Sequence, residues 1–203
     1  MENANPSLDP ANTDTLVGAF REILNKMLQN TDGMLPAQVI AYEAPTANSP
    51  ARVSVQPLIQ MITTAGDIVS RAQIAKLPVL QIGGGGFILN FPIQTGDFGW
   101  IMANDRDISI FLQTYAQAAP NTNRKKNFAD AIFIPCTVRG YTIASGDAAN
   151  ATFQSLDGTV RVSLGSTTIT LTAPNVIING TLQTQNIDID GNITVTSPPL
   201  IVA

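Results

Sequence analysis

The C-terminal stretch from Asp157 to Thr196 reads DGTVRVSLGSTTITLTAPNVIINGTLQTQNIDIDGNITVT. Its short runs alternate apolar, mostly β-branched residues with small polar ones, which is the period-two pattern of β-strands. Glycine and Asn-Gly at the breaks supply the positive φ angles of tight turns. The stretch has no lysine and only one arginine. We therefore predict a narrow, repetitive β structure for this part of the chain.

A structure this thin cannot bury its apolar face as a single chain. The conformational entropy lost on ordering it exceeds what its aliphatic side chains return when they pack in one sheet. Winding three copies about one axis buries alternate apolar positions from all sides and pairs every strand edge with a neighbour. We therefore expect an intertwined trimeric β-helix, or β-prism. The predicted trimer core consists of Ile169, Leu171, Ile187, Ile189, Ile193 and Val195.

Composition and charge limit the class of protein. The 203 residues are 44% hydrophobic and 13% charged, which is typical of packed, ordered proteins. A net charge of −4 lacks the basic footprint of phosphate-backbone binding, so we expect no nucleic-acid partner. No apolar run reaches the length of a membrane span, and the first ten residues do not resemble a signal peptide. We expect the chain to be soluble and uncleaved.

The missing residue types argue against catalysis and cofactors. The chain has no histidine and one cysteine, Cys136, so it can form neither a disulfide framework nor a zinc site. A serine or cysteine nucleophile would have no histidine to activate it. Because Cys136 lies in the apolar run 131–138, we predict a buried, inert thiol. We predict a protein that is not an enzyme and holds no cofactor.

The first of three predicted segments, residues 1–33, contains an amphipathic helix. Asn12, Thr13 and Asp14 offer N-caps, and Asp32-Gly33 ends the helix. Its apolar residues recur at spacings of three and four: Leu16, Val17, Phe20, Ile23, Leu24, Met27 and Leu28. Either the helix lies on its own domain, or it forms a short three-helix contact on a symmetry axis.

The second segment, residues 34–140, is predicted to be a compact β domain. Its strand candidates are 38–42, 52–58, 88–93, 99–102, 108–111 and 131–138, with a possible helix at 68–75. This number of strands favours a small closed barrel such as an OB-fold, with a β-sandwich as the alternative. Lysine and aromatic residues become rare near position 140. We therefore place the third segment at 141–203, with residues 146–151 as a short linker.

Three local motifs allow both a functional and a structural interpretation. No Lys-Ser or Lys-Thr follows the glycine run 83–86, so we predict a hairpin rather than a phosphate loop. The basic cluster Arg124 to Lys126 is predicted to be a solvated loop. Asp97, Asp105 and Asp107 suit turns and strand ends better than acid–base catalysis.

The chain from Ser197 to Ala203 stops the β pattern with two prolines and continues as an uncharged apolar tail. We interpret this tail as a plug that closes the end of the β-prism. Alternatively, the same plug is a point that meets a lipid bilayer. The predicted apex residues are Pro198, Pro199, Leu200, Ile201 and Val202.

Several motifs occur in a fixed order along the chain. The middle segment carries LPV at 77–79, GGGG at 83–86, FPI at 91–93 with GD at 96–97, DRDI at 105–108 and DAIFIP at 130–135. The last segment carries ITLTAPN at 169–175, NG at 179–180 and GNITV at 191–195. Together they resemble the OB domain and β-prism repeats of the central spike, or membrane-puncturing, proteins of contractile phage tails, which are related to type VI secretion spikes.

The resemblance implies a homotrimer located in the virion, at the tail baseplate. It implies an OB-fold ring that seats on baseplate hub proteins, and a stiff β-helix that pierces the host outer membrane during tail contraction. It also implies no enzymatic activity. Many such spikes hold an iron ion at the tip through a His-x-His pair from each chain. Since this chain has no histidine, we expect Pro199 to Val202 to pack around the axis instead.

Two other functional classes remain as alternatives. One is a non-enzymatic tail adaptor or receptor-binding fibre, but such fibres usually expose aromatic side chains for stacking on sugars, and beyond Tyr141 only Phe153 is aromatic. The other is an OB-fold nucleic-acid binder, which would need a basic groove. The acidic pI near 4.6 argues against it.

Overall fold

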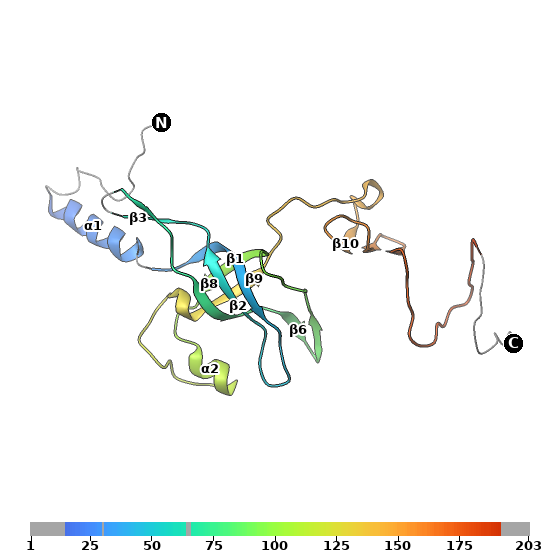
Figure 1. Ribbon diagram of the computed structural model, residues 1–203, viewed down its shortest axis with the longest axis horizontal. Helices are drawn as coiled ribbons and strands as arrows, with labels where there is room; N and C mark the ends of the chain where they lie inside the picture. The colour runs from blue at the N-terminus through green and yellow to red at the C-terminus, as the bar shows by residue number, and fades with distance from the viewer. Residues whose placement is uncertain (1–14, 30, 64–65, 192–203) are drawn as a thin grey trace. The chain divides into compact units, whose positions relative to one another are not determined.

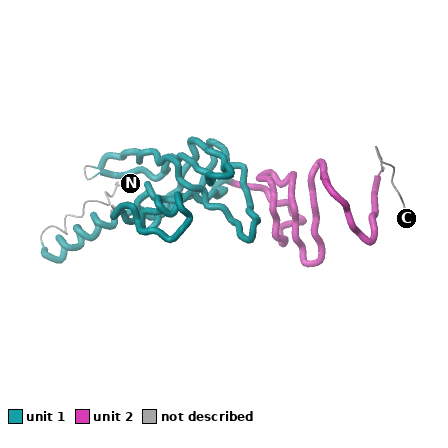
Figure 2. Tube along the Cα trace, turned by 90° about the horizontal axis from the view of Figure 1, so that it is seen from below, with its two compact units in different colours: residues 1–139 teal, residues 140–203 magenta. Residues whose placement is uncertain are grey.

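The computed structural model describes residues 15–29, 31–63 and 66–191. The chain divides into two compact units, Met1–Arg139 and Gly140–Ala203, which Figure 2 shows in different colours. The fold is mainly β, with few helices.

The first unit begins with the helix α1 (Leu16–Gln29). The Thr15 hydroxyl caps it by accepting a hydrogen bond from the Gly18 N–H at 3.0 Å. At the other end, Thr31 donates from its N–H to the Leu28 carbonyl and from its hydroxyl to the Met27 carbonyl. The helix predicted from the three-four spacing is therefore present. The predicted caps at 12–14 lie outside the described residues.

A five-stranded antiparallel sheet forms the body of this unit, with the order β5-β2-β1-β8-β9. Figure 1 shows it as a curved layer, and it is a half-barrel in shape. A parallel bridge between Val79 and Phe133 links its two edges, and the Leu80 N–H donates to the Phe133 carbonyl at 2.7 Å. The strands are β1 (Met34–Glu43), β2 (Arg52–Pro57), β5 (Ile74–Pro78), β8 (Phe98–Ala103) and β9 (Ala131–Pro135).

Alternation along these strands builds the core. In β2, for example, Val53 and Val55 are buried while their neighbours are partly exposed, as expected when one face of a strand points inward. The fully buried side chains at the centre are Val39, Val53, Val55, Leu77, Ile101 and Phe133. One curved sheet therefore encloses the core, rather than the two stacked sheets of a sandwich.

Two short hairpins extend from the sheet: β3 (Met61–Ile62) with β4 (Ile68–Val69), and β6 (Ile82–Gly84) with β7 (Phe87–Leu89). The second hairpin turns at Gly85 and Gly86, whose φ angles are +60° and +85°. Two successive positive φ angles are what a tight two-residue hairpin turn requires. The hairpin predicted at the glycine run is thus confirmed.

Two predictions of local structure were wrong. The stretch 108–111, predicted to be a strand, begins the helix α2 (Ser109–Thr114), because an Asp107 carboxylate oxygen accepts the Ser109 N–H at 2.9 Å and starts a helical turn. The stretch 68–75, predicted as a possible helix, is instead divided between β4 and the start of β5. The predicted strand 88–93 forms only in part, as β7.

The second unit contains a three-stranded antiparallel sheet of β10 (Ala151–Gln154), β11 (Arg161–Leu164) and β12 (Ile169–Thr172). From Ala173 to Gly191 the described chain contains no strand. A C-terminal β-helix is therefore not seen in the single chain. The predicted linker at 146–151 contains part of a 3₁₀ turn (Ser145–Asp147) with a buried Asp147.

Candidate functional site: exposed apolar surfaces and two ionic clusters

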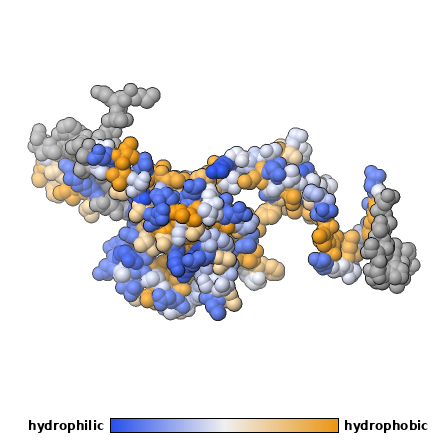
Figure 3. Space-filling model, in the orientation of Figure 1, coloured by the Kyte–Doolittle hydropathy of each residue, from blue (hydrophilic) through white to orange (hydrophobic). Residues whose placement is uncertain are grey.

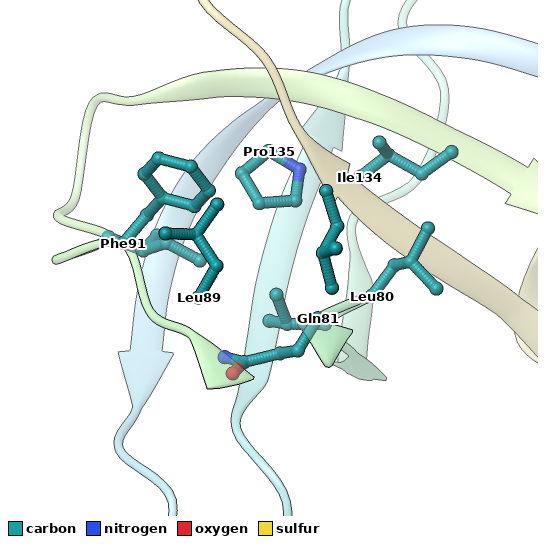
Figure 4. A pocket seen from close by; sticks show the side chains of 9 residues that line it. Leu80, Gln81, Leu89, Phe91, Ile134 and Pro135 are labelled. Atoms are coloured by element: carbon teal, nitrogen blue, oxygen red, sulfur yellow. The ribbon is translucent and has the colours of Figure 1, made fainter. Parts of the chain in front are cut away.

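A small apolar pocket lies between the β6–β7 hairpin and β9. Figure 4 shows Leu89 and Phe91 on one side and Ile134 and Pro135 on the other. Gln81 is the only polar residue in its lining, which is completed by Val79, Leu80, Ile82 and Ile93. The cavity measures about 70 Å³. Pockets that bind metabolites measure ~300–1,000 Å³, so this one is too small for such a ligand.

Around the pocket, the hairpin exposes a larger apolar surface. We call it the hairpin patch, and it consists of Leu80, Ile82, Phe87, Ile88, Leu89 and Phe91. Phe87, at the turn, is 84% exposed. No charged residue occurs between Lys76 and Asp97. An uncharged apolar surface of this kind is typical of a contact with another macromolecule rather than of a catalytic centre.

A second depression, of about 410 Å³, lies beside β5 and the 127–129 turn. Arg71 is the only charged residue in its lining. Its guanidinium lies 3.6 Å from an Asp32 carboxylate oxygen and 5.9 Å from the centre of the Phe128 ring. Asp32 also accepts the Phe128 N–H at 2.9 Å. Arg71 therefore helps to hold Asp32, which follows α1, against the 127–129 turn.

The first ionic cluster joins Arg124 to two buried carboxylates. The Arg124 Nε and Nη2 donate to the two oxygens of Asp130 at 2.9 and 3.0 Å, and Nη2 lies 3.3 Å from Asp107. Hydrogen bonds from Ser109 and Thr122 lower the pKa of Asp107 to about 2, with a smaller contribution from the Arg124 charge. The hydrogen bond to Asp130 raises the pKa of Arg124.

The cluster adds a structural role to a residue that was predicted to be solvated. The loop 124–126 is exposed as predicted, and the Arg124 side chain is 44% exposed, but its guanidinium also fastens the loop that carries α2 onto the start of β9. Asp107 and Asp97 serve in turns, as predicted: Asp97 accepts the Gln94 N–H at 2.7 Å. The two buried carboxylates, Asp107 and Asp130, are both ion-paired with Arg124, which is not the arrangement of a general acid or base.

The second ionic cluster joins the 3₁₀ turn before β10 to the strand β11 of the second unit. Asp147 accepts from the Arg161 Nε at 2.6 Å and from the Ser163 hydroxyl at 2.6 Å. Asn150 donates to the Ser163 hydroxyl oxygen at 2.9 Å. The hydrogen bond from Ser163, followed by that from Arg161, lowers the pKa of Asp147. Sequence reasoning missed this cluster, although a lone arginine in a charge-poor repeat was a signal for a buried partner.

The predicted trimer core is exposed in the single chain where it is described. Ile169 and Leu171, on β12, are 73% and 59% exposed, and Ile187 and Ile189 are also exposed. Figure 3 shows apolar residues along this C-terminal stretch. Ile193 and Val195 lie outside the described residues. So do the predicted apex residues Pro198, Pro199, Leu200, Ile201 and Val202.

Cys136 is exposed, which corrects the prediction of a buried thiol. The strand β9 ends at Pro135, so the inward alternation that buries Ala131 and Phe133 stops before Cys136. Across the described residues, no group of three acidic or cysteine side chains is arranged to hold a metal ion. Within the same ranges, no helix has the length and apolarity needed to span a bilayer.

Residues 35–136 match the family model of the phage protein Gp138 N-terminal domain. The matched region runs from the start of β1 to just past β9 and covers half of the chain. It therefore includes the half-barrel sheet, the hairpin patch and the Arg124 cluster. No curated protein matches the chain.

Proposed function

The chain belongs to the family of the phage protein Gp138 N-terminal domain, and from this premise we propose that it is the homotrimeric central spike of a phage tail baseplate. Membership indicates a structural component of a phage virion. In our proposal, the C-terminal part pierces the host outer membrane when the tail contracts, and the barrel seats on baseplate hub proteins. The likeness to type VI secretion spikes is part of the same proposal.

The observation that carries the proposal is the exposure of apolar side chains beyond β11. Six aliphatic residues between Val176 and Ile189 are all exposed in the single chain: Val176, Ile177, Ile178, Leu182, Ile187 and Ile189. Because the residues of this region form no strand, their backbone groups do not take part in a strand ladder within the single chain. Three copies wound together would bury those side chains and pair those groups, giving a stiff, narrow rod without free edges.

The strand order of the first unit supports the OB-fold part of the proposal. The strand β1 pairs with both β2 and β8, while β5 and β9 approach each other in parallel at Val79 and Phe133. Five strands closed in this order give a small barrel of the OB type. The hairpin patch projects from the connection between β5 and β8, where such a barrel can meet a neighbouring protein.

We propose that the protein acts mechanically, without enzymatic activity. The buried carboxylates of the Arg124 cluster are ion-paired, the apolar pocket is small, and the sequence has no histidine. A spike needs resistance to unfolding under load rather than a catalytic site. The alternative, a tail adaptor or receptor-binding fibre, has less support because the second unit has only two aromatic residues, Tyr141 and Phe153.

The mass of the full chain in solution tests the trimer. We expect light scattering to give three times 21.5 kDa, and a monomer would contradict the proposal. Puncture is tested separately in phage particles that carry Leu200→Asp and Ile201→Asp. We expect these particles to adsorb normally and to lose infectivity, whereas Gln185→Asp particles stay infective. Lost adsorption of the Leu200→Asp and Ile201→Asp particles would favour the fibre instead.

A further inference from the structure

The helix α1 presents a wide apolar face that stays exposed and has no counterpart among the described residues of its own unit. Its seven large apolar side chains are each 55–77% exposed, and Figure 3 shows apolar colour along the helix. They are Leu16, Val17, Phe20, Ile23, Leu24, Met27 and Leu28. The interpretation of a helix lying on its own domain therefore does not hold.

The pattern of the face indicates how many neighbours it meets. Leu16, Phe20, Ile23 and Met27 have the four-three-four spacing of a coiled-coil seam. Val17 and Leu24 make a second seam with the same Phe20 and Met27. At about 100° per residue, the face spans roughly 140° of the helix, which is wider than the single seam of a two-stranded coiled coil. A helix with two overlapping seams suits a bundle in which it touches two neighbours.

The size of the face fits a specific contact. At the observed exposures, each side chain leaves on the order of 100 Å² accessible, so the face offers roughly 700 Å² in total. This total is close to the ~800 Å² that one protein contributes to a standard interface, and in the bundle it is divided between two neighbours. An isolated helix of 14 residues is also marginal in water. Burial of this face therefore supplies the stability that the helix lacks within its own unit.

The opposite side of α1 is polar and suited to solvent. Glu22 and Lys26 form a salt bridge of 2.8 Å there, one helical turn apart. Arg21 and Asn25 are also exposed. The helix is therefore two-sided, with one face to bury and one to leave in water, as in a small bundle.

The residues just before β1 are hydrogen-bonded to other parts of the barrel unit. The Asp32 N–H donates to the Lys126 carbonyl at 2.9 Å, and the Ala103 N–H donates to the Gly33 carbonyl at 2.9 Å. Each copy of the barrel therefore carries its helix at the start of β1. Barrels related by a threefold axis carry three helices related by the same axis, so all three helices point in the same sense along it and an antiparallel arrangement is excluded.

We propose that three copies of α1 pack their apolar faces together in a short parallel bundle at the N-terminal end of the barrel unit. This inference rests on the proposed homotrimer and adds to it a second contact, separate from the C-terminal β-helix. The occupant of the apolar face is thus the same helix in two other copies. The bundle aligns the three barrels before or while the C-terminal parts wind together.

Cross-linking of single cysteines in the full chain tests the bundle. In a Cys136→Ser background, Phe20→Cys and Met27→Cys place a thiol on both seams, and Asn25→Cys places it on the polar side. With a short three-armed maleimide, we expect covalent trimers from the two seam variants, at least about tenfold more than from Asn25→Cys. Two seam variants are used so that the test still works if one of them fails to fold.

The outcomes separate this inference from the proposed function. A trimeric mass without cross-linked trimers from either seam variant overturns the helix bundle and leaves the spike proposal in place. A monomeric mass overturns both. Cross-linked pairs without trimers contradict the threefold arrangement. As an independent readout, amide hydrogen exchange of residues 16–29 should be slow in the unmodified protein and at least about tenfold faster in Ile23→Asp. Fast exchange in the unmodified protein overturns the bundle.

Discussion

At the scale of single residues, Gly99 is the described glycine of the barrel unit with the least space for a side chain. A Cβ added there would lie 2.5 Å from the Ile134 carbonyl oxygen and would also overlap the Phe133 ring. Phe133 is fully buried and forms part of the bridge that links β9 to Val79. Because Gly99 has no side chain, the buried Phe133 ring can lie directly against the backbone of β8.

Gly99→Ala is expected to destabilise the first unit by about 1–3 kcal/mol or more, because backbone and a buried ring cannot both move aside. Chemical denaturation of the full chain, followed by the fluorescence of the single tryptophan, Trp100, measures the change. Gly140→Ala is the matched control, since nothing lies within 4 Å of its added Cβ. Equal stability of the two variants would contradict this account of Gly99.

The lowered pKa of Asp107 predicts that the stability of the fold falls at acid pH. Its pKa of about 2 in the fold lies below the ordinary value of 3.8, so its ionised form stabilises the native state above the ordinary pKa. That stabilisation is lost as the pH falls from about 4 towards 2. We expect Asp107→Asn to be less stable than the unmodified protein at pH 7, with the difference shrinking between pH 4 and pH 2.

Thermal unfolding across this pH range measures the effect. Asp105→Asn serves as the control, because the Asp105 side chain is 86% exposed and its contact with Lys126, at 3.9 Å, is weak. A difference for Asp107→Asn that stays constant down to pH 2 would mean that its charge has no part in stability.

At the scale of elements, the sequence predicts strands well where one face is buried. The strands β1, β2, β8 and β9 were anticipated because Ala37, Val39, Val53, Val55 and Ile101 alternate with more exposed residues. The strand β5 was not anticipated. Lys76 within it has a φ of +58°, and its pairing with β2 shifts register, which breaks the period-two pattern.

The side-chain clusters that join distant segments could not be predicted from the periodicity of the sequence. Arg124 and Asp107 lie 17 residues apart, and Arg161 and Asp147 lie 14 apart. No local pattern indicates which acidic residue a given arginine meets after folding. The hairpin at the glycine run, by contrast, was predictable because its turn depends on Gly85 and Gly86 themselves.

The Asp147 cluster is expected to hold the sheet of β10, β11 and β12 together. Asp147→Ala leaves Arg161 and Ser163 without their shared acceptor, so amide exchange in β11 should accelerate by about tenfold or more. Exchange in the strands of the first unit should not change. Asp190→Ala, at an exposed position, is the control. Unaltered exchange in β11 would show that the strands do not depend on the cluster.

Considered as a whole, the described chain has one unit that encloses its own core and a second unit that leaves most of its large apolar side chains exposed. Val39, Leu77 and Phe133 are buried within one chain, but Ile169 and Leu171 are not. The sequence predicted this contrast through its composition, since the second unit has few large side chains to enclose a core. In the proposed trimeric β-helix the core contacts lie between chains, so the period-two pattern of one chain predicts its strands but not its path.

Leu171→Asp is expected to weaken the trimer, because it places a charge in the predicted core. Thr170→Asp is the matched control, because the neighbouring residue of a strand points to the other face. Gel electrophoresis in detergent after mild heating should show monomers for Leu171→Asp at a temperature where Thr170→Asp and the unmodified protein remain trimeric. Equal dissociation of the two variants would remove Leu171 from the core.

The exposed Cys136 gives experimenters a natural handle on this assembly. It is the only thiol in the chain, and it follows the last strand of the barrel. A spin label attached there would report one position per subunit without any mutation. Pulsed resonance spectra of a threefold ring would then contain a single inter-label separation, whereas a skewed trimer would give more than one.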